Sequence, residues 1–86
     1  MKTSRARTWT FVLYPESAPD DWQTRLAEMA VPCLVSPEHK DDVNVDGSKK
    51  KPHYHIVMLY SAPHTYEQVL SVSKSMNATI PQRVKD

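Results

Sequence analysis

The residues with the clearest chemical potential are His53 and His55, which open an apolar and aromatic segment that ends at Tyr60. Side chains alternate between the two faces of a strand, so both imidazoles lie on one face, with backbones roughly 6.5–7 Å apart. Imidazole nitrogens at this spacing can reach one metal ion. A solvated or hydrogen-bonded strand edge would carry the same pair. The pair by itself leaves both interpretations open.

A polar segment over residues 38–50 offers further ligands, because it begins with His39 and continues with Asp41 and Asp42. If the strands on either side of it pair as neighbours, His39 comes to lie beside the other two histidines. One aspartate, preferably Asp42, then completes a set of three nitrogens and one oxygen. Such a set suits Mn²⁺, Mg²⁺ or Zn²⁺, and accepts Co²⁺ or Ni²⁺ in vitro. The alternative is a hydrophilic loop whose charges balance.

Basic residues are clustered although the net charge is only +1, so the total charge does not indicate a nucleic-acid-binding protein. Lys49, Lys50 and Lys51 directly precede the histidine segment. Lys2, Arg5 and Arg7 precede the first apolar segment, and Arg83 and Lys85 lie near the end of the sequence. Clusters in these places can bind phosphates beside a metal ion, which would act as a Lewis acid on a phosphodiester. Solvated strand ends are the alternative.

Length and composition limit the protein class. Eighty-six residues make at most one small domain with one core. A single cysteine, Cys33, excludes an internal disulfide and fits a reducing cytoplasm. No apolar run approaches membrane-spanning length, and the N-terminus has no signal-peptide core. We therefore expect a cytoplasmic protein that has no membrane partner.

The elements that position these residues follow from hydrophobic periodicity. Alternation predicts a strand over residues 8–14, and helical spacing predicts a helix over residues 19–30 that starts at a capping box of Ser17 and Asp20. The apolar residues 31–35 predict a second strand, expected to pair with the first.

The second half repeats this scheme. The histidine strand is followed by a turn at residues 61–63 and a helix that begins with the capping box of Thr65 and Gln68 and ends near Asn77. A last strand is expected from Ala78, bent by Pro81. This order indicates an α+β fold, an antiparallel ferredoxin-like sheet with two helices on one face, which leaves the other face free to carry the metal site.

These motifs together resemble a known family. The segments are Thr10–Ser17, Val31-Pro32, Ser36-Pro37 with His39 and Asp42, and Lys51–His55. In this order they are similar to the N-terminal part of rolling-circle plasmid replication initiators, the Rep proteins of the streptococcal broad-host-range plasmid type. These relaxase-like nickases belong to the HUH endonuclease superfamily.

The resemblance implies a metal-dependent DNA endonuclease and nucleotidyltransferase that nicks and rejoins plasmid origin DNA. It implies binding of a single-stranded hairpin loop and the adjacent duplex, Mn²⁺ or Mg²⁺ as the metal, and an oligomeric full-length protein. By motif, the metal ligands are His39, Asp42, His53 and His55, and the first motif, Thr10–Ser17, is mainly structural. We expect Lys49, Lys50, Lys51, Arg5 and Arg7 to contact DNA.

One departure from the family concerns the nucleophile. In the family a tyrosine attacks the phosphodiester, remains attached to the 5′ phosphate and frees a 3′ hydroxyl. None of the tyrosines here occupies the corresponding position: Tyr14, Tyr54, Tyr60 and Tyr66. We expect residues 1–86 to be the N-terminal portion of the endonuclease domain, truncated before the tyrosine helix and inactive alone. The alternatives are a non-catalytic metal- and DNA-binding fragment or degenerate remnant, and a small protein with a structural metal unrelated to DNA.

Overall fold

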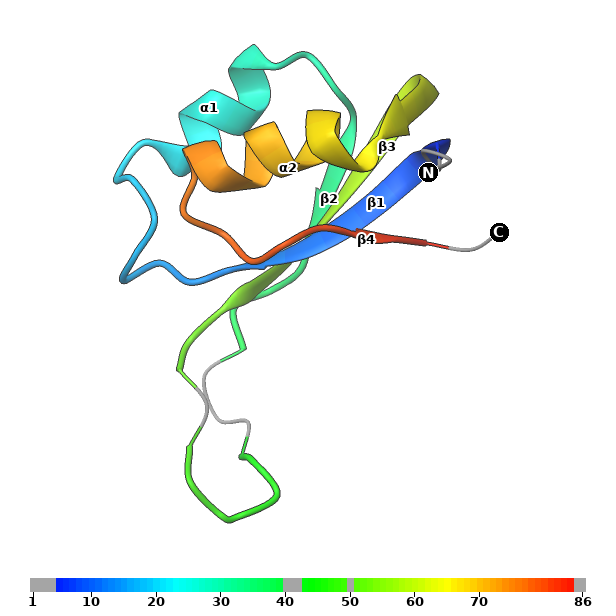
Figure 1. Ribbon diagram of the computed structural model, residues 1–86. Coiled ribbons are helices and arrows are strands. Elements are labelled where there is room, and N and C mark those ends of the chain that lie inside the picture. The colour runs from blue at the N-terminus through cyan, green and yellow to red at the C-terminus, as the bar shows by residue number, and fades with distance from the viewer. Residues whose placement is uncertain (1–4, 40–42, 50, 85–86) are drawn as a thin grey trace.

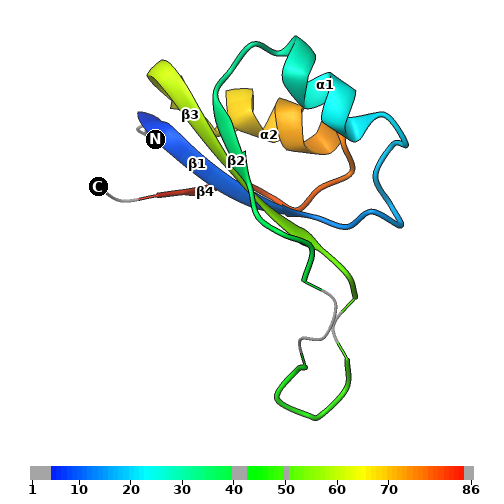
Figure 2. The ribbon, with the colours of Figure 1, turned by 180° about the vertical axis from the view of Figure 1, so that it is seen from behind.

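The computed structural model describes residues 5–39, 43–49 and 51–84. Its elements are β1 (Arg5–Leu13), α1 (Trp22–Glu28), β2 (Cys33–Val35), β3 (Tyr54–Thr65), α2 (Tyr66–Ser75) and β4 (Gln82–Arg83). All the strand pairs are antiparallel, in the spatial order β2-β3-β1-β4. Both helices lie on one face of this sheet (Figures 1 and 2). The α+β prediction is confirmed.

The core lies between the sheet and the two helices. Alternation along β1 buries Trp9, Phe11 and Leu13, because these side chains project to the helical side. The rest of the core comes from the neighbouring elements: Trp22, Leu26, Ile56, Met58, Tyr60, Val69 and Met76. Trp22 therefore packs in the core, where its ring centroid lies 5.1 Å from that of Tyr54.

The opposite face of the sheet is not covered by either helix. Val12 pairs with His55, and Thr10 pairs with Val57. Residues directly opposite each other on paired strands project to the same face, so His55 shares the uncovered face with Val12. This face can carry the site that the sequence predicted there.

Two predictions of strand arrangement were wrong. β2 pairs with β3 and not with β1, because β1 already has β3 on one edge and β4 on the other. The expected turn at residues 61–63 is an irregularity inside β3, which continues to Thr65 because the start of β1 pairs with its end.

The helix boundaries agree with the sequence at α2 better than at α1. The capping box of Thr65 and Gln68 is present, and Asn77, with φ +53°, follows the end of α2. By contrast, α1 starts at Trp22, and its N-cap, Asp21, makes no side-chain capping bond, so the predicted start at residue 19 and the capping box at Ser17 were wrong. The last strand begins after Pro81, later than expected. Within the described ranges, neither helix is long and apolar enough to span a membrane.

Candidate metal centre

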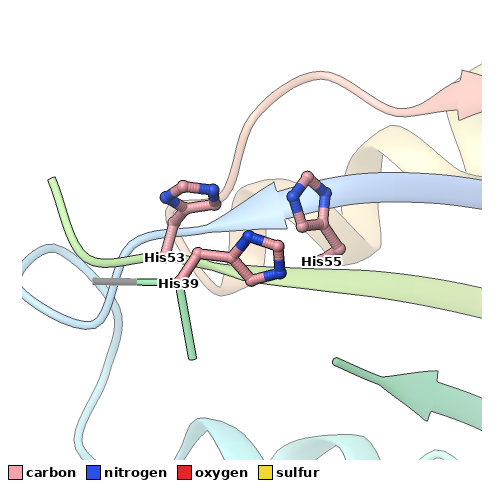
Figure 3. Close-up of side chains that lie close together, drawn as sticks. All are labelled: His39, His53 and His55. Atoms are coloured by element: carbon pink, nitrogen blue, oxygen red, sulfur yellow. The ribbon is translucent and has the colours of Figure 1, made fainter. Parts of the chain in front are cut away.

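Three imidazole rings converge where β3 begins (Figure 3). The ring centroids lie 5.1 Å apart for His39 and His53, 4.8 Å for His39 and His55, and 5.1 Å for His53 and His55. One possible ligand nitrogen from each ring lies within 4.8 Å of the others. The structure thus brings together the three histidines that the sequence selected, from segments separated by the polar loop.

Backbone hydrogen bonds fix the positions of these residues. The amide of His39 donates to the carbonyl of His53 at 2.8 Å, and the amide of His53 donates back at 3.1 Å. His55 is held in the same way by Ser36, whose amide donates to the His55 carbonyl at 3.0 Å and whose hydroxyl accepts from the His55 amide at 2.9 Å. The histidines are therefore placed by the sheet ladder and not by a free loop.

A one-residue offset in this ladder selects His39. Val35 pairs with Ile56, but the next bridge joins His39 to His53, so the β2 side has one residue more than β3. Without this bulge, Glu38 would lie opposite His53. Bulges re-aim side chains in this way, and Pro37, which has no amide donor, is a residue they tolerate.

The His53 side chain is oriented by a backbone carbonyl. Its Nδ1 lies 2.8 Å from the carbonyl oxygen of Lys51. A carbonyl only accepts, so Nδ1 carries the proton and Nε2 has the lone pair for a ligand. His53 is 6% exposed, whereas His55 is exposed, so the cluster is sheltered on one side and open on the other.

The donor set fits a divalent transition metal. Nitrogens bound to one ion at about 2.0–2.1 Å in tetrahedral geometry lie about 3.4 Å apart, so small side-chain rotations would close the present spacing. Three imidazoles suit Zn²⁺, Co²⁺ or Ni²⁺, and a carboxylate would favour Mn²⁺. The predicted carboxylate ligand, Asp42, lies outside the described residues, as does Lys50.

A groove of about 610 Å³ adjoins two of the histidines, His53 and His55. The other residues that line it are Val12, Tyr14, Glu16, Ser17, Asn44, Lys49 and Lys51. The Lys51 ammonium lies 2.8 Å from a Glu16 carboxylate oxygen, and this hydrogen bond raises the pKa of Lys51, which stays cationic. The groove therefore combines imidazoles with two of the lysines predicted to contact phosphates.

Sequence reasoning did not assign Tyr14, Glu16, Ser17 and Asn44 to this groove. The Tyr14 ring centroid lies 6.0 Å from that of His53. Alternation along the first strand already placed Tyr14 on the uncovered face, and this signal could have located it.

Other predicted residues lie elsewhere. Arg5 and Arg7 line a separate groove with Arg83. The tyrosines at positions 54, 60 and 66 belong to the helical side of the sheet, where they contact or form the core.

Comparisons with known proteins identify the family of this chain. The family model for the plasmid replication protein, origin binding domain, matches residues 1–86. The chain is 48% identical over 81 residues to a replication protein of Staphylococcus aureus, covering 94% of this chain and 41% of the relative. It is 44% identical over 80 residues to replication protein RepB of Lactiplantibacillus plantarum, covering 93% of this chain and 36% of the relative.

A third relative extends the pattern. Replication protein RepB of Streptococcus agalactiae is 44% identical over 71 residues, covering 80% of this chain and 34% of the relative. The chain thus spans 34–41% of the length of these curated relatives. Because the family model covers every residue, the chain belongs to the origin-binding domain family of plasmid replication proteins.

Proposed function

We propose that this chain is the part of a rolling-circle plasmid replication initiator that binds origin DNA and holds a divalent metal ion at His39, His53 and His55, with Asp42 as a further ligand. The observation that carries the proposal is the convergence of three imidazoles beside a groove that also presents Lys49 and Lys51. Imidazole ligands hold a metal ion, and ammonium groups attract phosphate.

The bound metal, Mn²⁺ or Mg²⁺, would supply Lewis-acid polarisation of a phosphodiester oxygen. The chain's own residues supply the surroundings. His53 is held in one tautomer by the Lys51 carbonyl, and the lysine side chains attract the DNA backbone to the groove. Tyr14 forms one wall of the groove, with an aromatic face on which an unpaired base can stack.

The nucleophile in this proposal is a tyrosine outside residues 1–86. Its hydroxyl loses a proton as its oxygen forms a bond to phosphorus, and the bond from phosphorus to the 3′ oxygen breaks. The 3′ oxygen takes up a proton, which leaves a 5′-phosphotyrosine link and a free 3′ hydroxyl. Tyr54 packs against Trp22, and Tyr66 lies 6.4 Å from Trp9 between ring centroids, so both face the core and not the groove. We expect the 86-residue chain to bind origin DNA without cleaving it.

The test is a metal titration of the chain and its histidine variants. Binding is measured by calorimetry and by the visible absorbance of Co²⁺. His53→Ala and His55→Ala should each weaken binding by at least about 10–100-fold, the loss that even outer groups of metal sites cause.

His64→Ala is the matched control, because its Nδ1 also contacts a backbone carbonyl, that of Ala62 at 2.9 Å, but it lies outside the cluster. Equal affinity for the parent, His53→Ala and His64→Ala would refute the ligand assignment. Cleavage of an origin hairpin oligonucleotide by the 86-residue chain with Mn²⁺ would refute the position of the nucleophile.

A further inference from the structure

A second groove lies at the end of the sheet away from the histidines. It has a volume of about 500 Å³ and is lined by Arg5, Ala6, Arg7, Thr8, Pro63, Arg83 and Val84. Among these described residues there are three guanidinium groups and no carboxylate. We infer that this arginine groove, defined by Arg5, Arg7 and Arg83, binds backbone phosphates of DNA without any metal ion.

The fold gathers these arginines from both ends of the chain. Arg5 and Arg7 belong to the start of β1, and Arg83 belongs to β4, whose pairing with β1 brings it opposite Trp9. β4 accordingly lies beside β1, and the start of β1 lies at the end of the sheet opposite the loop that follows β2 (Figures 1 and 2). All three arginines are exposed, so DNA can reach them.

An irregularity in β3 shapes the groove. Thr8 pairs with Leu59 and Ala6 pairs with His64, so β3 contains three more residues than β1 over this stretch, opposite Arg7. Pro63, which lines the groove, lies in this bulged stretch. A bulge bends a strand away from its partner and changes the direction of nearby side chains. The hollow is therefore part of the sheet and does not depend on a loop.

The chemistry of the arginine groove favours phosphate. Guanidinium groups present planar pairs of donors that match phosphate oxygens, and they stay charged at any physiological pH. The groove beside the histidines, by contrast, contains the carboxylate of Glu16. The two grooves thus differ in kind: the first presents imidazoles beside a carboxylate, whereas the described lining of the second presents guanidinium groups and no carboxylate.

The spacing suits one DNA molecule. Val12 lines the histidine groove, and Arg5 and Arg7 precede it on β1 by seven and five residues. At about 3.3 Å per residue, the grooves lie roughly 17–23 Å apart along the strand. With 3.4 Å per base pair along each strand, this is about 5–7 base pairs of duplex. The inference rests on the proposed function, since it gives that DNA a second contact.

The test measures binding of a short double-stranded oligonucleotide, and of its single strand, in EDTA at several salt concentrations. The triple variant R5Q/R7Q/R83Q should bind at least about tenfold more weakly than the parent, and the slope of log K against log salt should fall by about 2–3, about 0.9 per lost phosphate contact. The corresponding Arg→Lys variant should recover most of the slope. If the triple variant loses affinity for only one of the two oligonucleotides, that oligonucleotide shows whether the groove binds duplex or single-stranded DNA.

Arg25→Gln is the control, because Arg25 lies on α1 in the helical layer and pairs with Asp21 at 2.8 Å. Retained Co²⁺ binding shows that the triple variant is folded. If the folded triple variant binds both oligonucleotides as Arg25→Gln does, the arginine groove is not a DNA site, while the proposed function stands. If the parent binds neither oligonucleotide in EDTA, the metal-free contact is refuted. If it also fails to bind them with Mn²⁺, the proposed function fails as well.

Discussion

Glu16 forms an ion pair with the ammonium of Lys51, and both residues line the groove beside the histidines. A phosphate in this groove must compete with the Glu16 carboxylate for Lys51, and it is also repelled by that carboxylate. Both side chains are exposed, so the competition is modest. Glu16→Gln should therefore strengthen binding of an oligonucleotide about two- to fivefold at low salt, measured by fluorescence anisotropy.

The control is Glu28→Gln, which removes the same charge from the exposed surface of α1. Equal affinities for the two variants would show that Lys51 does not contact the DNA backbone.

Tyr60 bears on stability and not on the site. Its ring is 9% exposed and stacks on His64 with centroids 3.9 Å apart, but its hydroxyl has no hydrogen-bond partner among the described residues. Tyr60→Phe keeps the ring and removes a buried polar group, so the free energy of unfolding should rise by about 1 kcal/mol. Urea unfolding at neutral pH measures this change.

Burial also raises the pKa of Tyr60 above its ordinary value of 10.0. The unfolded chain therefore loses this proton first, and the parent loses stability as pH rises above 10. Tyr60→Phe lacks this loss, so the stability difference between the proteins should widen with alkaline pH. A difference that stays constant through this range would contradict the account.

At the residue scale, the sequence predicted that the three histidines lie together, but it did not predict which other residues line the groove beside them. Period-two alternation alone places His53 and His55 on one face, and the structure agrees. The position of Glu16 beside Lys51 depends on two segments far apart in sequence, and no local pattern reports such a contact. Asp42 stays a prediction.

The bulge after β2 is the element that determines which residue joins the histidine pair. If the strand were regular, residue 38 would lie opposite His53, and with the bulge residue 39 does. Exchanging Glu38 and His39 keeps the composition and should lower metal affinity as much as His39→Ala does. Co²⁺ absorbance measures the loss, and Glu38→Ala is the control that should retain binding. An exchanged variant with parental affinity would show that the register is wrong.

Element types were more predictable than their partners. The capping box of α2 and the alternation of β1 are local signals, and both are present in the structure. The partner of β2 was predicted wrongly, since pairing depends on which sheet edges the rest of the chain leaves open. The extension of β3 to Thr65 has the same cause, because it requires the start of β1 as its partner.

At the scale of the whole molecule, β1 connects the two grooves. The helices cover one face of the sheet and bury the core (Figure 1). The groove beside the histidines includes Val12 near the end of β1, and the arginine groove includes Arg5 and Arg7 at its start. The sequence predicted the layers from the order of elements. It did not separate the basic residues into two sites, because this separation follows from the pairing of β4 with β1.

The central claim is that these histidines hold a metal ion that DNA phosphate can reach. Pulsed electron paramagnetic resonance of the Mn²⁺-loaded chain tests it most directly, because Mn²⁺ reports the nuclei bound to it. The account predicts ¹⁴N coupling from imidazole. The His64→Ala variant should retain this coupling, and the double variant with His53→Ala and His55→Ala should lose it. It also predicts a new ³¹P coupling when an origin hairpin oligonucleotide is added. Mn²⁺ that shows no ¹⁴N coupling, or the same ¹⁴N coupling after both histidines are replaced, would contradict the account.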